Sequence, residues 1–105
     1  MLEIVIDTTL VSQRLEVALG GDVFVLEVRW NEHLGRYVLD TYDAEGSPLL
    51  LGRAVEVDQD LYAGHRVTSP DLPADELRAF DSSGLGEACG EGDLGGRVRL
   101  IYVGT

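Results

Sequence analysis

The side chains best suited to covalent or acid–base chemistry are Cys89, His33 and His65. A catalytic thiol needs an imidazole within hydrogen-bond reach. Here the two histidines fall in a predicted turn and a predicted loop, far along the chain from the cysteine. Nothing in this spacing brings the three side chains together, so we predict no catalytic residues and no enzymatic activity.

Closely spaced carboxylates are the second candidate chemistry, because divalent cations bind clustered oxygen ligands. The group before Gly46 lacks the D-x-D-x-D-G order and the distant bidentate glutamate of a calcium loop. Isolated acidic pairs in loops are usually solvated, so we expect no bound metal and no cofactor. The acidic groups considered are Asp58 with Asp60, Glu91 with Asp93, and Asp40 with Asp43 and Glu45.

Negative charge dominates the composition. The chain of 105 residues carries 19 carboxylates against eight basic residues, all arginine, for a formal net charge of −11. The electrostatic field of such a chain repels phosphate, so we expect no nucleic-acid partner. The glycine pairs Gly84-x-Gly86 and Gly90-x-Gly92 have carboxylates beside them, which also repel phosphate, so we expect no nucleotide site there. A basic or polar protein partner fits this charge better, although solubility alone also explains it.

The residues predict neither a secretory signal nor a membrane span. One cysteine rules out an intrachain disulfide framework, and the first residues lack the basic segment and apolar core of a secretory signal. No apolar stretch reaches the roughly 18 residues of a membrane span. We therefore expect synthesis in the cytoplasm and no membrane contact.

Period-two alternation runs through most of the chain and predicts strands joined by tight turns. Residues 1–12 read as an edge strand or arm. Gly20-Gly21 then supplies a hairpin turn between two alternating segments. Further hairpins follow at turns 31–35 and 43–46, and Gly52 marks either a bulge or a bend where the sheet curls over on itself. The side chains expected in the core are Phe24, Leu26, Val28, Trp30, Tyr37, Leu39, Val98, Leu100 and Tyr102.

A short strand at 76–81 and a final strand from Arg97 complete the pattern. The final strand could pair with an early one and help to close a barrel. Residues 1–105 are therefore predicted to form a single all-β domain. We expect a small antiparallel barrel or sandwich of about six to seven strands, built from consecutive hairpins, with little helix.

Two long loops interrupt the strands, at 58–75 and 82–96. The second is acidic and rich in glycine, so we expect it to be flexible. The first presents an aromatic residue and an arginine, the types that dominate interface energetics, and loops of this length are often functional. Its candidate interface residues are Tyr62, His65 and Arg66.

One ordered set of residues extends over most of the chain: Trp30-Asn31, Tyr37 to Leu49, Gly52, Asp60-Leu61, Gly64, Leu72-Pro73, Leu77, Leu94-Gly95 and Val98 to Val103. In this set the chain resembles the small baseplate plug proteins of contractile-tailed bacteriophages and related prophages. This resemblance implies a β-rich virion structural protein at the central hub of the tail baseplate, contacting tail tube or hub proteins and without enzymatic activity. A homo-oligomer in the assembled particle is expected as well. The acidic Gly-rich loop departs from the short loop usual before the last strand.

Two other classes of function remain open. One is a free acidic binding module, for example an inhibitor of a basic nucleic-acid-binding enzyme, which rests on the net charge alone. The other is a small metal- or sugar-binding barrel that uses Trp30, Tyr37 or Tyr42 as a stacking platform. Alternation places Trp30 and one tyrosine mainly in the core, so we favour the assembly component.

Overall fold

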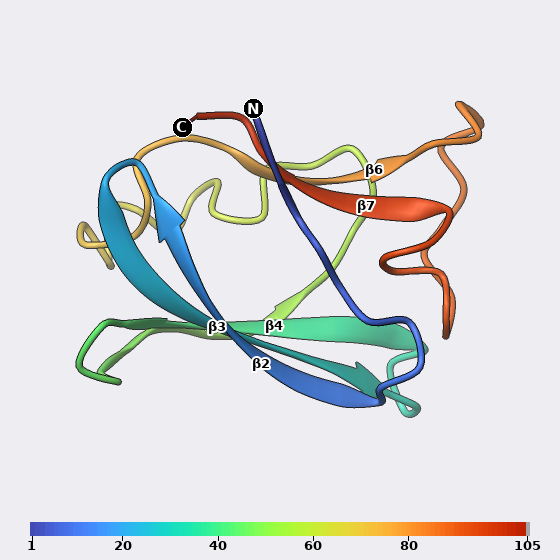
Figure 1. Cartoon of the computed structure of the whole chain (residues 1–105), viewed down its shortest axis with the longest axis horizontal. Helices are drawn as coiled ribbons and strands as arrows, with labels where there is room; N and C mark the ends of the chain where they lie inside the picture. The colour runs from blue at the N-terminus through green and yellow to red at the C-terminus, as the bar shows by residue number, and fades with distance from the viewer. Residues whose placement is uncertain (105) are drawn as a thin grey trace.

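Two antiparallel sheets, one above the other, make up the protein (Figure 1). The computed structural model describes residues 1–104. None of these residues belongs to a helix long and apolar enough to cross a membrane. The strands are β1 (Leu2–Ile4), β2 (Ser12–Leu19), β3 (Asp22–Asn31), β4 (Arg36–Asp43), β5 (Pro48–Ala54), β6 (Leu77–Asp81) and β7 (Val98–Tyr102).

The larger sheet has the order β2-β3-β4-β5, in which each strand pairs with its neighbour in the chain. The predicted hairpins are therefore present. At the first turn Gly20 and Gly21 have φ of 64° and 91°, and Leu19 pairs with Asp22. A two-residue turn with positive φ at both positions twists with its strands, and glycine reaches that conformation without strain.

The last hairpin of this sheet is irregular at the predicted bulge. Gly52 has a φ of 75°, and the register between β4 and β5 shifts beside it. Its N–H donates to Oδ1 of the buried Asp40 at 2.7 Å, and Arg29 pairs with the same carboxylate from the neighbouring strand. The bulge therefore lets the backbone supply one of the partners that this buried charge requires.

The smaller sheet has the order β1-β7-β6, and it joins the two ends of the chain. Leu2 pairs with Tyr102 and Ile4 with Leu100, so the final strand does pair with an early one. The two sheets stay separate, with the smaller sheet lying over one face of the larger one (Figure 1). The fold is thus an open sandwich rather than a closed barrel.

A single hydrophobic cluster fills the space between the sheets. Eight of the nine expected core residues are buried in it, whereas Trp30 is only half-buried and packs edge-on against Tyr37 with ring centroids 5.1 Å apart. Trp30 is the second-last residue of β3, so it lies toward one end of the sandwich. The eight buried residues are Phe24, Leu26, Val28, Tyr37, Leu39, Val98, Leu100 and Tyr102.

Candidate protein interface

Tyr62, the aromatic residue expected to project from the 58–75 loop, is fully buried in the core. Its hydroxyl lies 2.9 Å from the hydroxyl of Thr41, which is also fully buried, on β4. Burial raises the pKa of Tyr62 well above its ordinary value of 10.0, because the phenolate would lose its hydration. The prediction of an exposed Tyr62 is therefore wrong, and the residue anchors the loop to the larger sheet.

Arg66 holds the same loop together from within. Its guanidinium donates to the backbone oxygens of Pro73 and Asp75 at 3.0 and 2.6 Å, and it pairs with Asp60 at 2.9 Å. The same group lies over the ring of Tyr62, 5.8 Å from its centroid. Several of its donors are thus committed inside the chain, which gives Arg66 a role in shaping this surface.

Asp60 is the acceptor that joins the loop to β6. Its Oδ1 accepts from the N–H groups of Tyr62 and Leu77, each at 3.1 Å. Burial alone would raise the pKa of Asp60, but these two N–H groups and Arg66 stabilise the carboxylate, and the net pKa is lowered. Asp60, one of the acidic pair with Asp58 in the sequence, is thus an anchor of the loop in the structure.

His65 is the third expected interface residue, and it lies at the turn between the other two. It is half-buried, and its backbone accepts from Ser69 and donates to Tyr62. Neighbouring Ala63, Gly64 and Val67 are exposed. The structure therefore brings Tyr62, His65 and Arg66 together on one loop, where Tyr62 is fully buried and His65 and Arg66 are both partly exposed.

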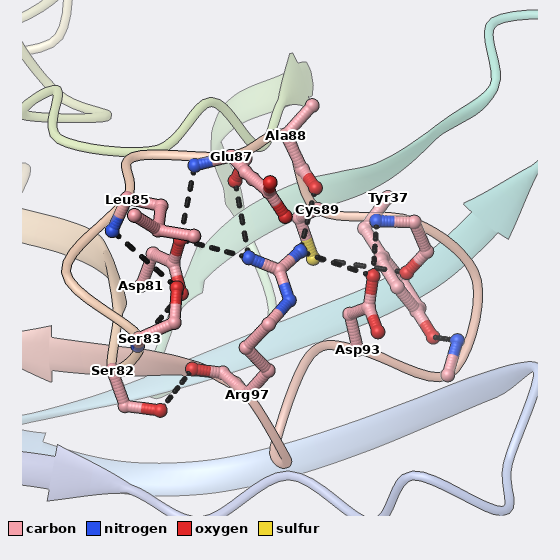
Figure 2. Close-up of polar contacts among 12 residues, drawn as sticks. Tyr37, Asp81, Ser82, Ser83, Leu85, Glu87, Ala88, Cys89, Asp93 and Arg97 are labelled. Carbon is pink, nitrogen blue, oxygen red and sulfur yellow. Dashed lines mark hydrogen bonds and ion pairs between the residues drawn. The ribbon is translucent and has the colours of Figure 1, made fainter.

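The acidic Gly-rich loop at 82–96 folds around one guanidinium (Figure 2). Arg97 donates to the backbone oxygen of Ala88 at 2.7 Å, and it pairs with Asp81 at 2.9 Å and with Asp93 at 3.2 Å. Farther along the loop, the N–H of Gly92 donates to the Tyr37 hydroxyl at 2.8 Å. The loop is therefore fastened to β7, to the end of β6 and to the larger sheet.

Asp81, the last residue of β6, is the buried end of this network. It accepts from Oγ and N–H of Ser83, from the N–H of Glu87, and from Arg97. Burial works to raise the pKa of Asp81, but the Ser83 donors, the Glu87 N–H and Arg97 outweigh it and lower the pKa strongly. A single charged side chain thus organises the first half of the loop.

The cysteine beside this network is unsuited to nucleophilic chemistry. Cys89 is buried, and burial together with the nearby Asp93 raises the pKa of its thiol to about 11, so the thiol stays protonated at neutral pH. His33 is exposed at the tip of the β3–β4 turn and His65 lies in the other loop. Within residues 1–104, no group of three or more His, Cys, Asp or Glu side chains is arranged to hold a metal ion.

Most of the arginines pair with carboxylates of the same chain. Seven of the eight form ion pairs with carboxylates in the part of the chain that the structure describes. These pairs occupy eight of the 19 carboxylates, which leaves eleven without an arginine partner. The charges left without a partner are therefore almost all negative.

Some of the carboxylates without an arginine partner lie at one end of the sandwich. Asp22 on the β2–β3 turn, Asp43 and Glu45 on the β4–β5 turn, and Asp71 on the long loop line a shallow groove there. Asp22, Glu45 and Asp71 are exposed, whereas Asp43 is half-buried and accepts from two N–H groups of its own turn. Three solvent-exposed carboxylates, those of Asp22, Glu45 and Asp71, therefore lie around one groove. We call these three residues the acidic end.

The sequence pattern did not predict the role of Asp81 and Arg97, two residues that hold the acidic Gly-rich loop in place. A signal existed, because an aspartate that ends a strand and precedes Ser-Ser-Gly is typical of a residue that caps a turn. For Arg97 no local signal existed, since its partners depend on how the loop returns to the sheet.

Comparison with protein-family models gives a match over residues 1–105, the whole chain, to the family described as the cyanophage baseplate Pam3 plug gp18. Comparison with the curated proteins gives no match. The resemblance expected from the residues between Trp30 and Val103 is confirmed by this full-length match. The chain therefore belongs to a family of phage baseplate plugs, and its role is that of a structural part of the virion's tail baseplate.

Proposed function

We propose that this protein is a non-enzymatic plug at the central hub of a contractile tail baseplate, where it contacts tail tube or hub proteins. The observation that carries the proposal is the family match over the whole chain. We further propose that the chain is made in the host cytoplasm and enters the particle during tail assembly.

The arrangement of reactive groups supports a role without turnover. The Cys89 thiol is protonated and buried, and the carboxylates of Asp60 and Asp81 are consumed by loop-closing hydrogen bonds. A catalytic site needs acid, base or nucleophile aimed at a shared cleft. The strongest polar networks here instead hold loops against the sandwich, which is what a docking surface requires.

The acidic end is the contact surface that we propose for a basic or polar face of the tube or hub. Its three carboxylates, Asp22, Glu45 and Asp71, are exposed and have no arginine partner within the described residues. The half-buried His65 on the long loop stays a candidate contact, with Arg66 acting by holding that loop in shape. Charge complementarity would steer the encounter and make it sensitive to salt.

The test begins with mass spectrometry of purified tail particles and with co-purification of this chain with the tube and hub proteins of the same phage. Neutralising the acidic end with D22N, E45Q and D71N should weaken capture of the partner. The matched control is E16Q, E32Q and E91Q, which removes the same charge from exposed residues outside that end. Capture should be unchanged in the control.

Absence of the chain from particles would contradict the proposal. Salt-sensitive binding to a basic nucleic-acid-binding enzyme in place of tail proteins would favour the acidic inhibitor. Equal loss of capture in the two triple variants would show that net charge matters and that the acidic end is not the contact.

A further inference from the structure

The outer face of the smaller sheet exposes several large apolar side chains, whereas a solvent-facing sheet is normally polar there. Leu77 and Ala79 of β6 point into the core, while the alternate residue Phe80 is 52% exposed. Ile101 and Val103 continue the same outer surface beside it, and Met1 is nearly fully exposed at its edge. Together they line a shallow groove of about 470 Å³.

Charges frame this groove in balanced pairs. Glu3 on β1 pairs with Arg99 on β7 at 3.0 Å, and Arg78 on β6 pairs with Glu76 at 2.9 Å. Asp58 completes the rim. Three carboxylates and two guanidiniums give this face a formal charge of −1, whereas the whole chain carries −11.

We propose that this face binds a second copy of the same chain. Two chains of charge −11 repel one another over most of their surfaces, and this nearly neutral apolar face is where they meet with least repulsion. A basic partner would instead be matched by an acidic rim, which the groove lacks. The chemistry of the face therefore favours self-association over capture of a cationic surface.

The face is also complementary to itself. Its carboxylate Glu3 lies on β1 at one edge of the sheet, and its guanidinium Arg78 lies on β6 at the other edge. A two-fold axis parallel to the strands places β1 of one copy over β6 of the other, as an isologous interface requires. Each Glu3 then faces the Arg78 of the partner copy, because both residues pair with Ile101 across the sheet. Ile101 and Val103, on the outer face of the central strand β7, pack against their own copies, while Arg99 of the same strand stays paired with Glu3 of its own chain.

The size of the face sets the expected strength. Three strands of up to five residues cover roughly 15 by 15 Å, which is well below the roughly 800 Å² per partner of a standard stable interface. The dimer should therefore be weak in solution. Copies held close together in an assembled particle would associate more strongly through their effective concentration.

This inference goes beyond the proposed contact with tube or hub proteins and stands independently of it, because the acidic end and the apolar face are different surfaces. The test is sedimentation velocity of the isolated chain from about 10 μM to about 1 mM, at low and at high salt. We expect a dimer fraction that rises with concentration. Dimerisation should strengthen with salt, since screening removes the repulsion between two acidic chains.

Neutral substitutions locate the interface without changing charge. F80Q should weaken dimerisation at least tenfold, and V103Q provides a second variant on the same face. V67Q is the control, because Val67 is 90% exposed on the long loop. Far-UV circular dichroism and the unfolding midpoint report whether each variant keeps its fold.

A chain that stays monomeric at about 1 mM in both salts would overturn the proposal. Dimerisation that weakens as salt rises would overturn it as well, because the contact would then be driven by opposite charges. If folded F80Q and V103Q both dimerise as strongly as the parent, the contact lies on another face.

Discussion

The pair of hydroxyls between the loop and the larger sheet offers the sharpest test of where Tyr62 lies. In Y62F the Thr41 hydroxyl stays buried and loses its partner at 2.9 Å. An orphaned buried hydroxyl costs about 1–2 kcal/mol, so the free energy of unfolding should fall by that amount. For a domain of about 100 residues this lowers the melting temperature by roughly 4–15 °C.

The double variant separates the hydrogen bond from general damage to the core. T41V should cost about as much as Y62F, because it leaves the tyrosine hydroxyl without a partner. In Y62F/T41V both polar groups are gone, so the combined cost should be smaller than the sum of the two by about 1 kcal/mol. Urea denaturation followed by the fluorescence of Trp30, the single tryptophan, measures all four free energies.

Tyr42 provides the matched control. Tyr42 is half-buried on β4, and the guanidinium carbon of Arg14 lies over its ring, 5.1 Å from the ring centroid. The Tyr42 hydroxyl makes no hydrogen bond within residues 1–104. Y42F should therefore change stability by less than about 0.5 kcal/mol. Additive single variants, or a Y62F chain as stable as the parent, would refute the placement of Tyr62 in the core and return it to the exposed surface of the loop.

Three further outcomes follow from the same structure. G95A should be strongly destabilising in thermal unfolding, because its Cβ would collide with the backbone oxygen of Ile6, whereas G92A has a similar positive φ with open space and should cost only about 1 kcal/mol. R97A should speed hydrogen exchange of the 82–96 amides while leaving the central amides of β3 protected; unchanged exchange would show that Arg97 does not fasten the loop. Because burial raises the pKa of Tyr62 above 10.0, the unfolded chain releases this proton first, so stability should fall as pH rises beyond about 10, and less steeply in Y62F.

The hairpins could be predicted because each is a local feature. Alternation over 14–30 and positive-φ glycines at the turn determine both strands and their register, and the bulge at Gly52 carries its own glycine. The final strand was also readable from alternation. Its partners were not fixed by any local rule, because the β1–β7 pairing joins residues about a hundred positions apart.

The long loop shows why the surface was harder to predict than the sheets. An aromatic residue in a segment without periodicity is typical of an exposed contact. No residue near Tyr62 in the sequence indicates that its hydroxyl will pair with that of Thr41, 21 residues earlier. Arg66 reads as a free charge for the same reason. Its acceptors are backbone oxygens whose positions exist only after the loop has closed.

Arginine placement links the fold to the function of the family. An acidic chain with free arginines would present mixed charge on flexible loops, but here Arg66 and Arg97 turn inward and close the two long loops. Closing a loop before docking removes part of the ordering entropy that binding would otherwise cost. A part that must fit into a baseplate benefits from this closure, because it meets its neighbours with loops that already have their shape.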